Sequence, residues 1–441
     1  MILMTRLSFI TSYNKVLLKA SIPIVMQTLL FSSKGFIDVI LLGFISENSV
    51  AAAGLADRII MIVIIILSCL SSGGGYIASQ CYLNKEKFSS VITLTLLITL
   101  SFAIFLMVLS FVFYDEILAP PSVDKYTSQL TGKYLHIVSL SFPLMALSLI
   151  MSILLRIYNQ ANKVLLIFLV GLVINIIISL GLILWLGFDI SGAAWGTLTG
   201  VFVEFSLLSL SVLSIRDKVI STKGITLARL KSILIHSVSS GIGGLIWVLG
   251  SFLFYVLVGR TGSNVLYILA ILTPIESLLL SFTLGVTTAS GIELGKRIPV
   301  YPRAYIYYFV YQTLGLTLCM TLFLVMIALP ILWLAFDLYF ITIKQFPHFI
   351  LMMLFAVLLK SISIQLINGI LRCGGDIRFC LLLDGGVQWG VMLPCAYIMV
   401  SLKYPGEYVY SIVIFEESIK IIICYWRLKS DLWRRNLVAG Y

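Results

Sequence analysis

The chain has 441 residues, of which 60% are apolar and only 11% are charged, and its formal net charge is +11. This composition, with a mean hydropathy of +1.09, excludes a soluble globular protein, in which about a quarter of the residues are charged. The apolar runs reach the roughly 20 residues that a helix needs to cross a bilayer, and the alternation expected of outer-membrane barrel strands is absent. We therefore expect an all-α polytopic membrane protein.

Twelve apolar runs follow one another along the chain and predict twelve transmembrane helices. They centre on residues 20–43, 52–78, 90–113, 134–155, 164–186, 193–214, 234–258, 265–292, 305–333, 348–371, 380–400 and 408–426. The first run has no small-residue cleavage site and leads into further spans, so we interpret it as a retained helix and not as a signal peptide.

The basic residues predict the orientation, because loops rich in Lys and Arg stay in the cytoplasm. With these spans, 21 of the 30 Lys and Arg residues fall on one set of loops and ends, five on the other set, and four inside spans. We expect both termini and the basic loop 215–232 in the cytoplasm, and the chain in the cell inner (plasma) membrane. The net charge reflects this topology, and the sequence offers no soluble domain for nucleic acid to bind.

The residues that carry metal-dependent or nucleophilic chemistry form no cluster. The seven cysteines contain no C-x-x-C pair, and the three histidines stand alone near the ends of spans. Neither D-D-x-x-D nor H-E-x-x-H occurs, which argues against a membrane enzyme such as a prenyltransferase. We expect no enzyme, no metal site and no resident cofactor.

The two halves of the chain repeat one another. An offset of 216 residues superposes Ser21 on Ser237, Leu41 on Leu257, Gly43 on Gly259, Asn48 on Asn264, Leu155 on Leu371 and Arg156 on Arg372. Six-span halves of one orientation are typical of secondary transporters with a pseudo-two-fold axis along the membrane normal and a substrate site at the repeat interface. We expect an N-lobe at 1–214, a cytoplasmic inter-lobe loop at 215–232 and a C-lobe at 233–441.

Several motifs, taken in order, resemble the multidrug and toxic compound extrusion (MATE) transporters. They are ASIPIVMQ leading to FIDVILLG, SSGGGYIASQ, LLRIYNQANK, FDISGAAWGT and GILRCGGDIR, and they extend over nearly the whole chain. The resemblance implies two six-helix lobes in a V around a central cavity. It also implies a secondary active antiporter, which we expect to be monomeric in the bilayer and which exports amphipathic cationic compounds or drugs in exchange for protons or sodium ions. The alternative within the same superfamily is a flippase or exporter of lipid-linked oligosaccharide or another anionic metabolite.

Two charges, Lys34 and Asp38, interrupt the apolar run LLFSSKGFIDVILLGFI. An ionisable residue at bilayer depth is by default a functional hypothesis. Asp38 resembles an aspartate of the DinF-like branch of MATE transporters, and Pro23 resembles the first-span proline of that branch. The resemblance implies that Asp38 couples transport to an ion and that Pro23 is a conformational hinge. The alternative is a structural ion pair, since residues i and i+4 share one helix face.

The fifth span completes the predicted ion-coupling set of Asp38, Asn175 and Ser179. Asn175 resembles an asparagine that hydrogen-bonds the first-span aspartate in the DinF-like branch, and a buried amide needs such a partner. Ser179 stands where that branch can carry a second aspartate. A serine takes up no proton at physiological pH, so the two-carboxylate version of the site is not expected.

The C-lobe departs from the NorM-like branch, which carries a glutamate in span 7 and an aspartate in span 10. Trp247 and Ser361 stand at those places, so the cation site of that branch is missing and proton coupling is favoured over sodium coupling. Lys360 has two interpretations: a lysine that snorkels or pairs with a buried acid, or a cavity cation for an anionic group. Glu276, after Pro274, is a further candidate cavity residue, as is Lys34.

A second group of charges lies in the last span. Glu416, Glu417 and Lys420 are spaced at i, i+3 and i, i+4. This spacing predicts an internal salt bridge on one helix face.

Overall fold

The computed structural model of the chain describes residues 2–43, 45–112, 125–215, 221, 225–336 and 345–437. Only the backbone is described at 2–12, 32–40, 47, 125 and 228. The predictions for Lys34 and Asp38 therefore lie outside the described side chains. The described residues form helices and no strands, so the all-α fold class is confirmed.

The chain divides into two compact units, and two long helices contribute to both. We call Leu30–Gly241 the N-terminal unit, and Met1–Leu29 together with Ile242–Gly440 the C-terminal unit. The shared helices are α1 (Ile2–Gly43) and α9 (Leu227–Gly259). The predicted lobes follow the sequence repeat, whereas these units follow the packing, and the division into lobes stays a prediction.

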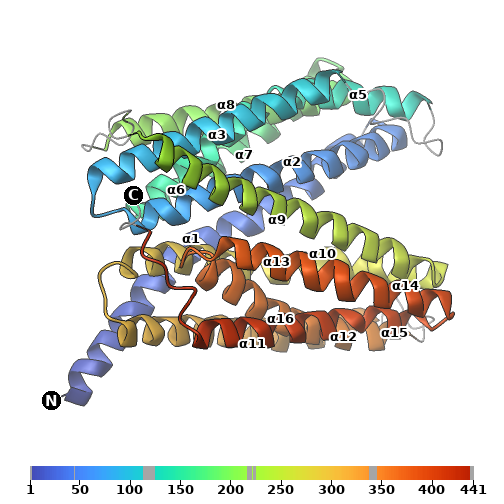
Figure 1. The fold of residues 1–441 in the computed structure, drawn as a ribbon. Coiled ribbons are helices and arrows are strands. Elements are labelled where there is room, and N and C mark those ends of the chain that lie inside the picture. The colour runs from blue at the N-terminus through green and yellow to red at the C-terminus, as the bar shows by residue number, and fades with distance from the viewer. Residues whose placement is uncertain are drawn as a thin grey trace. The chain divides into compact units, whose positions relative to one another are not determined.

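The N-terminal unit is a helical bundle in which α2 packs against α3, α5 and α6 (Figure 1). Its further described helices are α2 (Glu47–Gln80), α3 (Lys85–Val112), α5 (Lys125–Ser139), α6 (Phe142–Ile157), α7 (Ala161–Leu180), the π-helical η1 (Gly181–Trp185) and α8 (Ile190–Leu213). Asp189 begins α8, because its side chain accepts a hydrogen bond of 3.0 Å from the backbone N–H of Ser191. The core contains the fully buried Leu67 and Phe142.

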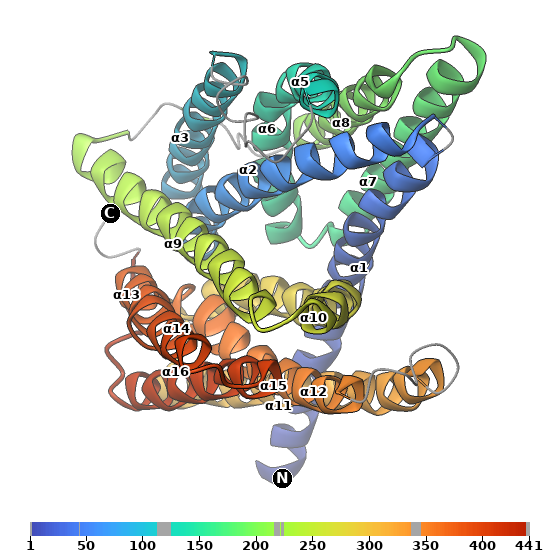
Figure 2. The same cartoon turned by 90° about the vertical axis from the view of Figure 1, so that its right-hand side faces the viewer.

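In the C-terminal unit, α12 packs against α10, α11 and α16 (Figure 2). The described helices of this unit, besides its share of α1 and α9, are α10 (Ser263–Arg297), α11 (Arg303–Ala335), α12 (Phe346–Ile364), the π-helical η3 (Gln365–Leu371), α13 (Ile377–Val387), the π-helical η4 (Gln388–Met392), α14 (Leu393–Ser401), α15 (Gly406–Tyr410) and α16 (Ile412–Lys429). Phe349, Ile350 and Met353 of α12 are fully buried in its core.

The described helices are long and apolar enough to cross a membrane. Nine of them qualify singly, and α5 with α6, bent by 48°, makes a tenth span. The other two predicted spans correspond to α1, with 42 residues, and to α15 with α16. Five charged residues interrupt α16, so its sequence alone is less apolar than that of its neighbours.

The helix boundaries repeat at the offset that the sequence predicts. The pairs separated by 216 residues are the ends of α1 and α9 at Gly43 and Gly259, the starts of α2 and α10 at Glu47 and Ser263, and the starts of α7 and α13 at Ala161 and Ile377. The turns agree as well, since Asn159 and Gly375 both have positive φ, 60° and 92°. The motifs LLRIYNQANK and GILRCGGDIR are therefore the same turn in two copies.

The helices α1 and α9 divide between the two units in the same way. The part of α1 before Leu29 packs in the C-terminal unit, where Tyr13 hydrogen-bonds Thr313 at 3.1 Å and Thr28 donates to the carbonyl of Ser281 at 3.0 Å. The part of α9 before Gly241 packs in the N-terminal unit, where a Cβ on Gly73 would lie 2.8 Å from the Cα of Ser237. Each repeat thus gives the first half of its first helix to the unit of the other repeat.

Glycine allows a close helix contact in the N-terminal unit, between α7 and α8. A Cβ on Gly200 would lie 2.7 Å from the carbonyl oxygen of Gly171 and 2.8 Å from Cβ of Asn175. These atoms belong to backbone or to a short side chain, so they have little freedom to move away. Small residues at such a crossing let transmembrane helices approach closely.

We expect Gly200→Ala to lower the stability of the protein by about 1–3 kcal/mol, the usual cost of overpacking. Gly54→Ala is the matched control, because nothing lies within 4 Å of the Cβ it would add on α2, and alanine favours a helix more than glycine does. Thermal unfolding in detergent measures both. Equal melting temperatures for the two variants would contradict the close contact.

Candidate functional site

Asn175 and Ser179 lie one turn apart on the face of α7 that packs against α8. Both side chains are almost completely buried, and Asn175 donates through Nδ2 to Oγ1 of Thr197 at 3.0 Å. Within the described residues, Oδ1 of Asn175 and Oγ of Ser179 have no hydrogen-bond partner. A buried polar atom without a partner costs about 1–3 kcal/mol. These two oxygens therefore form a buried polar position whose hydrogen-bonding capacity the described residues leave unused.

The C-terminal unit contains a continuous chain of polar contacts that connects four helices. It begins with Glu276 of α10, whose Oε1 lies 2.5 Å from Nζ of Lys360 on α12. One turn further on α12, Oγ of Ser363 contacts the carbonyl oxygen of Lys360 at 3.2 Å and also Oε2 of Glu417 on α16. The side chains of α12 thus join an acid of α10 to an acid of α16.

The same chain continues from α16 to α13. Nζ of Lys420 lies 2.7 Å from Oε1 of Glu416, 3.6 Å from Oδ1 of Asp384 and 4.0 Å from Oε1 of Glu417. Oδ2 of Asp384 in turn accepts a hydrogen bond of 3.3 Å from Nη2 of Arg372, the residue after η3. We call this set the polar chain: Glu276, Lys360, Ser363, Glu416, Glu417, Lys420, Asp384 and Arg372.

Burying the charges of the polar chain costs free energy unless the charges are paired. Asp384, Glu416, Glu417, Lys420 and Arg372 each expose less than a tenth of their surface. Buried ions keep their charge only when partners compensate for lost hydration. Such residues within membrane spans face a protein or aqueous interior and are functional candidates.

α12 and α13, which carry residues of the polar chain, each continue into a π-helical segment. η3 begins at Gln365, two residues after Ser363, and η4 begins at Gln388, four residues after Asp384. Gln365 connects three segments, because its Oε1 accepts from Thr287 and Thr317 and its Nε2 donates to Ser290. π-helical turns inside helices are frequent at functional sites.

The remaining predicted site residues lie apart from the polar chain. Trp247 of α9 has 44% of its surface exposed. Ser361 is buried, and its hydroxyl donates to the carbonyl of Leu358 in its own helix at 2.8 Å. Pro23 is buried within α1, which remains helical on both sides of it. The structure thus pairs Lys360 with Glu276 and leaves Trp247 and Ser361 outside this pair.

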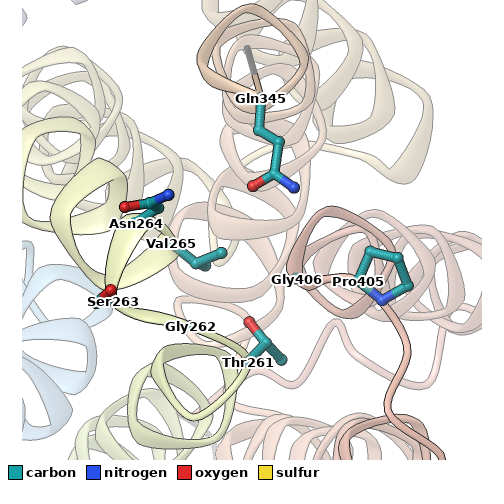
Figure 3. Close-up of a pocket in the computed structure, with 8 residues that line it drawn as sticks. All are labelled: Thr261, Gly262, Ser263, Asn264, Val265, Gln345, Pro405 and Gly406. Atoms are coloured by element: carbon teal, nitrogen blue, oxygen red, sulfur yellow. The ribbon is translucent and has the colours of Figure 1, made fainter. Parts of the chain in front are cut away.

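A shallow polar pocket of about 240 Å³ lies elsewhere in the C-terminal unit (Figure 3). The start of α10, Gln345 and the start of α15 line it, and none of its lining residues is charged. Glu276 is eleven residues along α10 from Val265, or about 16 Å at 1.5 Å per residue. The pocket is therefore separate from the polar chain.

Comparisons with known proteins point to one transporter fold. Residues 23–180 match the sequence model of the MatE family. The relative named Uncharacterized transporter YisQ, from Bacillus subtilis (strain 168), is 23% identical, with 95% of this chain and 94% of that protein covered. The crystal structure of MATE in the bent conformation matches with a TM-score of 0.82 and 18% identity, over 95% of this chain and 96% of the other. This chain has the fold of the MATE transporters.

A second solved structure with the MATE fold has a different reported pocket. It is a MOP superfamily transporter from Pyrococcus furiosus, for which a reverse polarity of the binding pocket suggests a different function. It matches this chain with a TM-score of 0.84 and 18% identity, over 96% of this chain and 97% of that one. A protein with the fold of this chain is thus described with a binding pocket of reverse polarity.

We expect the Glu276–Lys360 pair to stabilise the C-terminal unit only as a pair. Glu276→Gln or Lys360→Met alone leaves one charge uncompensated, which costs up to about 3–5 kcal/mol for buried pairs. The double variant should recover most of this loss. Thermal unfolding in detergent measures the three variants.

The matched control is the exposed pair of Lys133 and Asp189, whose side chains are 60% and 40% exposed. Lys133→Met should cost at most about 1 kcal/mol, because water screens surface pairs. A double variant at Glu276 and Lys360 that is as unstable as the worse single variant would contradict the pairing.

Proposed function

We propose that this chain is a secondary active transporter of the MATE family, closer to its DinF-like branch, which exports amphipathic cationic organic compounds or drugs in exchange for protons. The observation that carries the proposal is the MATE fold over nearly the whole chain, together with the MatE match of residues 23–180. We place the chain in the cell inner (plasma) membrane with both termini in the cytoplasm. It acts as a monomer and as a transporter, not an enzyme, driven by an ion gradient without a resident cofactor.

The coupling site of the N-terminal unit is assigned to Asp38 with Asn175 and Ser179. Nδ2 of Asn175 already donates to Thr197, so the group it still offers is an acceptor. An amide oxygen accepts a hydrogen bond from a protonated carboxylic acid and repels an ionised one. This supports an aspartate that binds a proton there. A sodium ion, which also takes oxygen ligands, is the alternative coupling ion.

A cationic substrate agrees better with the charges of the C-terminal unit than an anionic one. An exporter of lipid-linked oligosaccharide or another anionic metabolite needs a cation that is free for a phosphate or carboxylate. Lys360, the candidate for this role, has its ammonium 2.5 Å from Glu276. Its charge is therefore compensated within the protein.

Transport in everted membrane vesicles tests the proposal. A panel of cationic dyes is offered to vesicles with an imposed pH gradient and, in parallel, an imposed sodium gradient. We expect dye accumulation that follows the pH gradient and collapses with a protonophore. Accumulation that followed only the sodium gradient would replace the proton as the coupling ion, and no transport of any dye would reject the export of cations.

We expect Asp38→Asn to abolish uphill export while expression stays near normal, because asparagine keeps the shape of the side chain and removes its titration. If Lys34 and Asp38 are only a structural pair, Asp38→Asn or Lys34→Met alone destabilises the protein. The double variant would then restore both stability and export. Thermal stability and gradient-driven efflux of the three variants separate the two cases, and full uphill export by the double variant would eliminate the coupling role of Asp38.

A further inference from the structure

The polar chain of the C-terminal unit contains more acids than bases. Its carboxyl groups are Glu276 on α10, Asp384 on α13, and Glu416 and Glu417 on α16, and its cations are Lys360, Lys420 and Arg372. The other basic side chains on α10, α12, α13 and α16 lie elsewhere: His348, Arg378 and Lys429 are exposed, Arg427 pairs with Asp376, and Lys296 and Arg297 pair with Glu293. The buried Tyr410, Cys380 and Cys424 carry no positive charge. Four ionised acids and three bases leave one negative charge without a counterion.

The contacts identify Glu417 as the acid that is left over. Glu276 has Lys360 at 2.5 Å, Glu416 has Lys420 at 2.7 Å, and Asp384 has Arg372 at 3.3 Å. Each base is thus already closest to another acid. For Glu417 the nearest ammonium is that of Lys420 at 4.0 Å, and its close contact is with the neutral hydroxyl of Ser363.

Ser363 is arranged to accept a hydrogen bond from a protonated Glu417. Its single hydroxyl proton has an acceptor within reach, the carbonyl of Lys360 at 3.2 Å. When Ser363 donates there, its oxygen is an acceptor for the carboxylic acid of Glu417. An ionised Glu417 needs the same serine proton for itself, so Ser363 has a hydrogen bond for either state.

We propose that Glu417 is a proton-binding site in the C-terminal unit, distinct from Asp38. The Glu417 carboxylate takes a proton from a hydronium ion of the aqueous phase, forming one O–H bond and leaving water. It returns the proton to water by the reverse step. This inference rests on the proposed proton antiport and assigns it a second binding group. The ligand is a proton and not a metal cation, because the ammonium groups of Lys420 and Lys360 nearby would repel a second positive ion.

Infrared spectroscopy of the purified full-length protein tests the inference without any substrate. A protonated carboxylic acid has a carbonyl stretch that the carboxylate lacks. We expect this band in the wild type to disappear as the pH is raised from mildly acidic to mildly alkaline. Glu417→Gln should lack that component, whereas Glu293→Gln should keep it, since Glu293 is a buried acid paired with both Lys296 and Arg297.

The pH dependence of thermal stability provides a second readout. The folded protein holds a proton that an unfolded glutamate, with an ordinary pKa of about 4.3, has released at neutral pH. Stability therefore falls as the pH rises through the range in which Glu417 loses its proton. Glu417→Gln should remove this fall without losing stability at neutral pH. Glu416→Gln should instead lower the melting temperature, because it removes the closest partner of Lys420.

The test of the proton site at Glu417 can fail or succeed independently of the test of cation export. A wild type without a pH-dependent carbonyl band, or a band of unchanged amplitude in Glu417→Gln, overturns the inference whatever the protein transports. If cationic dyes are exported, Glu417→Gln should lose most uphill export and keep downhill movement. Full uphill export by that variant would also overturn the role of Glu417. If no dye is exported, the proposed function fails and the spectroscopic titration still decides the proton site.

Discussion

The ammonium of Lys420 is the group on which the arrangement of the C-terminal unit depends. It is 98% buried on α16 and contacts acids of its own helix and of α13. Because an ion in an apolar surrounding is stable only with close partners, α13 must present Asp384 at this depth. Arg372 then compensates Asp384 from the end of η3. One buried cation therefore relates the registers of three helical segments.

The two repeats use different chemistry at equivalent places, although they share helix boundaries. At the offset of 216 residues, Asn175 and Ser179 correspond to Val391 and Cys395, so the N-terminal polar position has an apolar counterpart. Lys420 corresponds to Glu204, which acts electrostatically on the buried Arg156. The repeat thus conserves the positions of helices while each unit carries its own set of polar groups, as expected if the units bind different ligands.

The sequence predicts the helices well because a membrane helix must be long, apolar and internally hydrogen-bonded, and all of these properties are local. The Glu416–Lys420 salt bridge follows from i, i+4 spacing and is present at 2.7 Å. The contacts of Glu417 with Ser363, and of Lys420 with Asp384, join residues far apart in the chain, for which one sequence holds no signal beyond a charge in an apolar span. The replacement of the NorM-like acids by Trp247 and Ser361 predicts that the cation site of that branch is missing, which stays a prediction, and it gave no indication of Glu417.

Two kinds of candidate proton or cation site follow from these differences. In the N-terminal unit, Oδ1 of Asn175 and Oγ of Ser179 are neutral oxygen atoms without a hydrogen-bond partner among the described residues, and under the proposed function they are ligands for the coupling ion. In the polar chain of the C-terminal unit, the three bases each pair with an acid, and the charge of one carboxylate is left over. A neutral acceptor site discriminates by geometry and can admit any cation of suitable size, whereas a cluster of ammonium groups around one carboxylate admits only a proton. Under the proposed function, the choice of coupling ion therefore rests on which of these two positions changes its occupancy during transport.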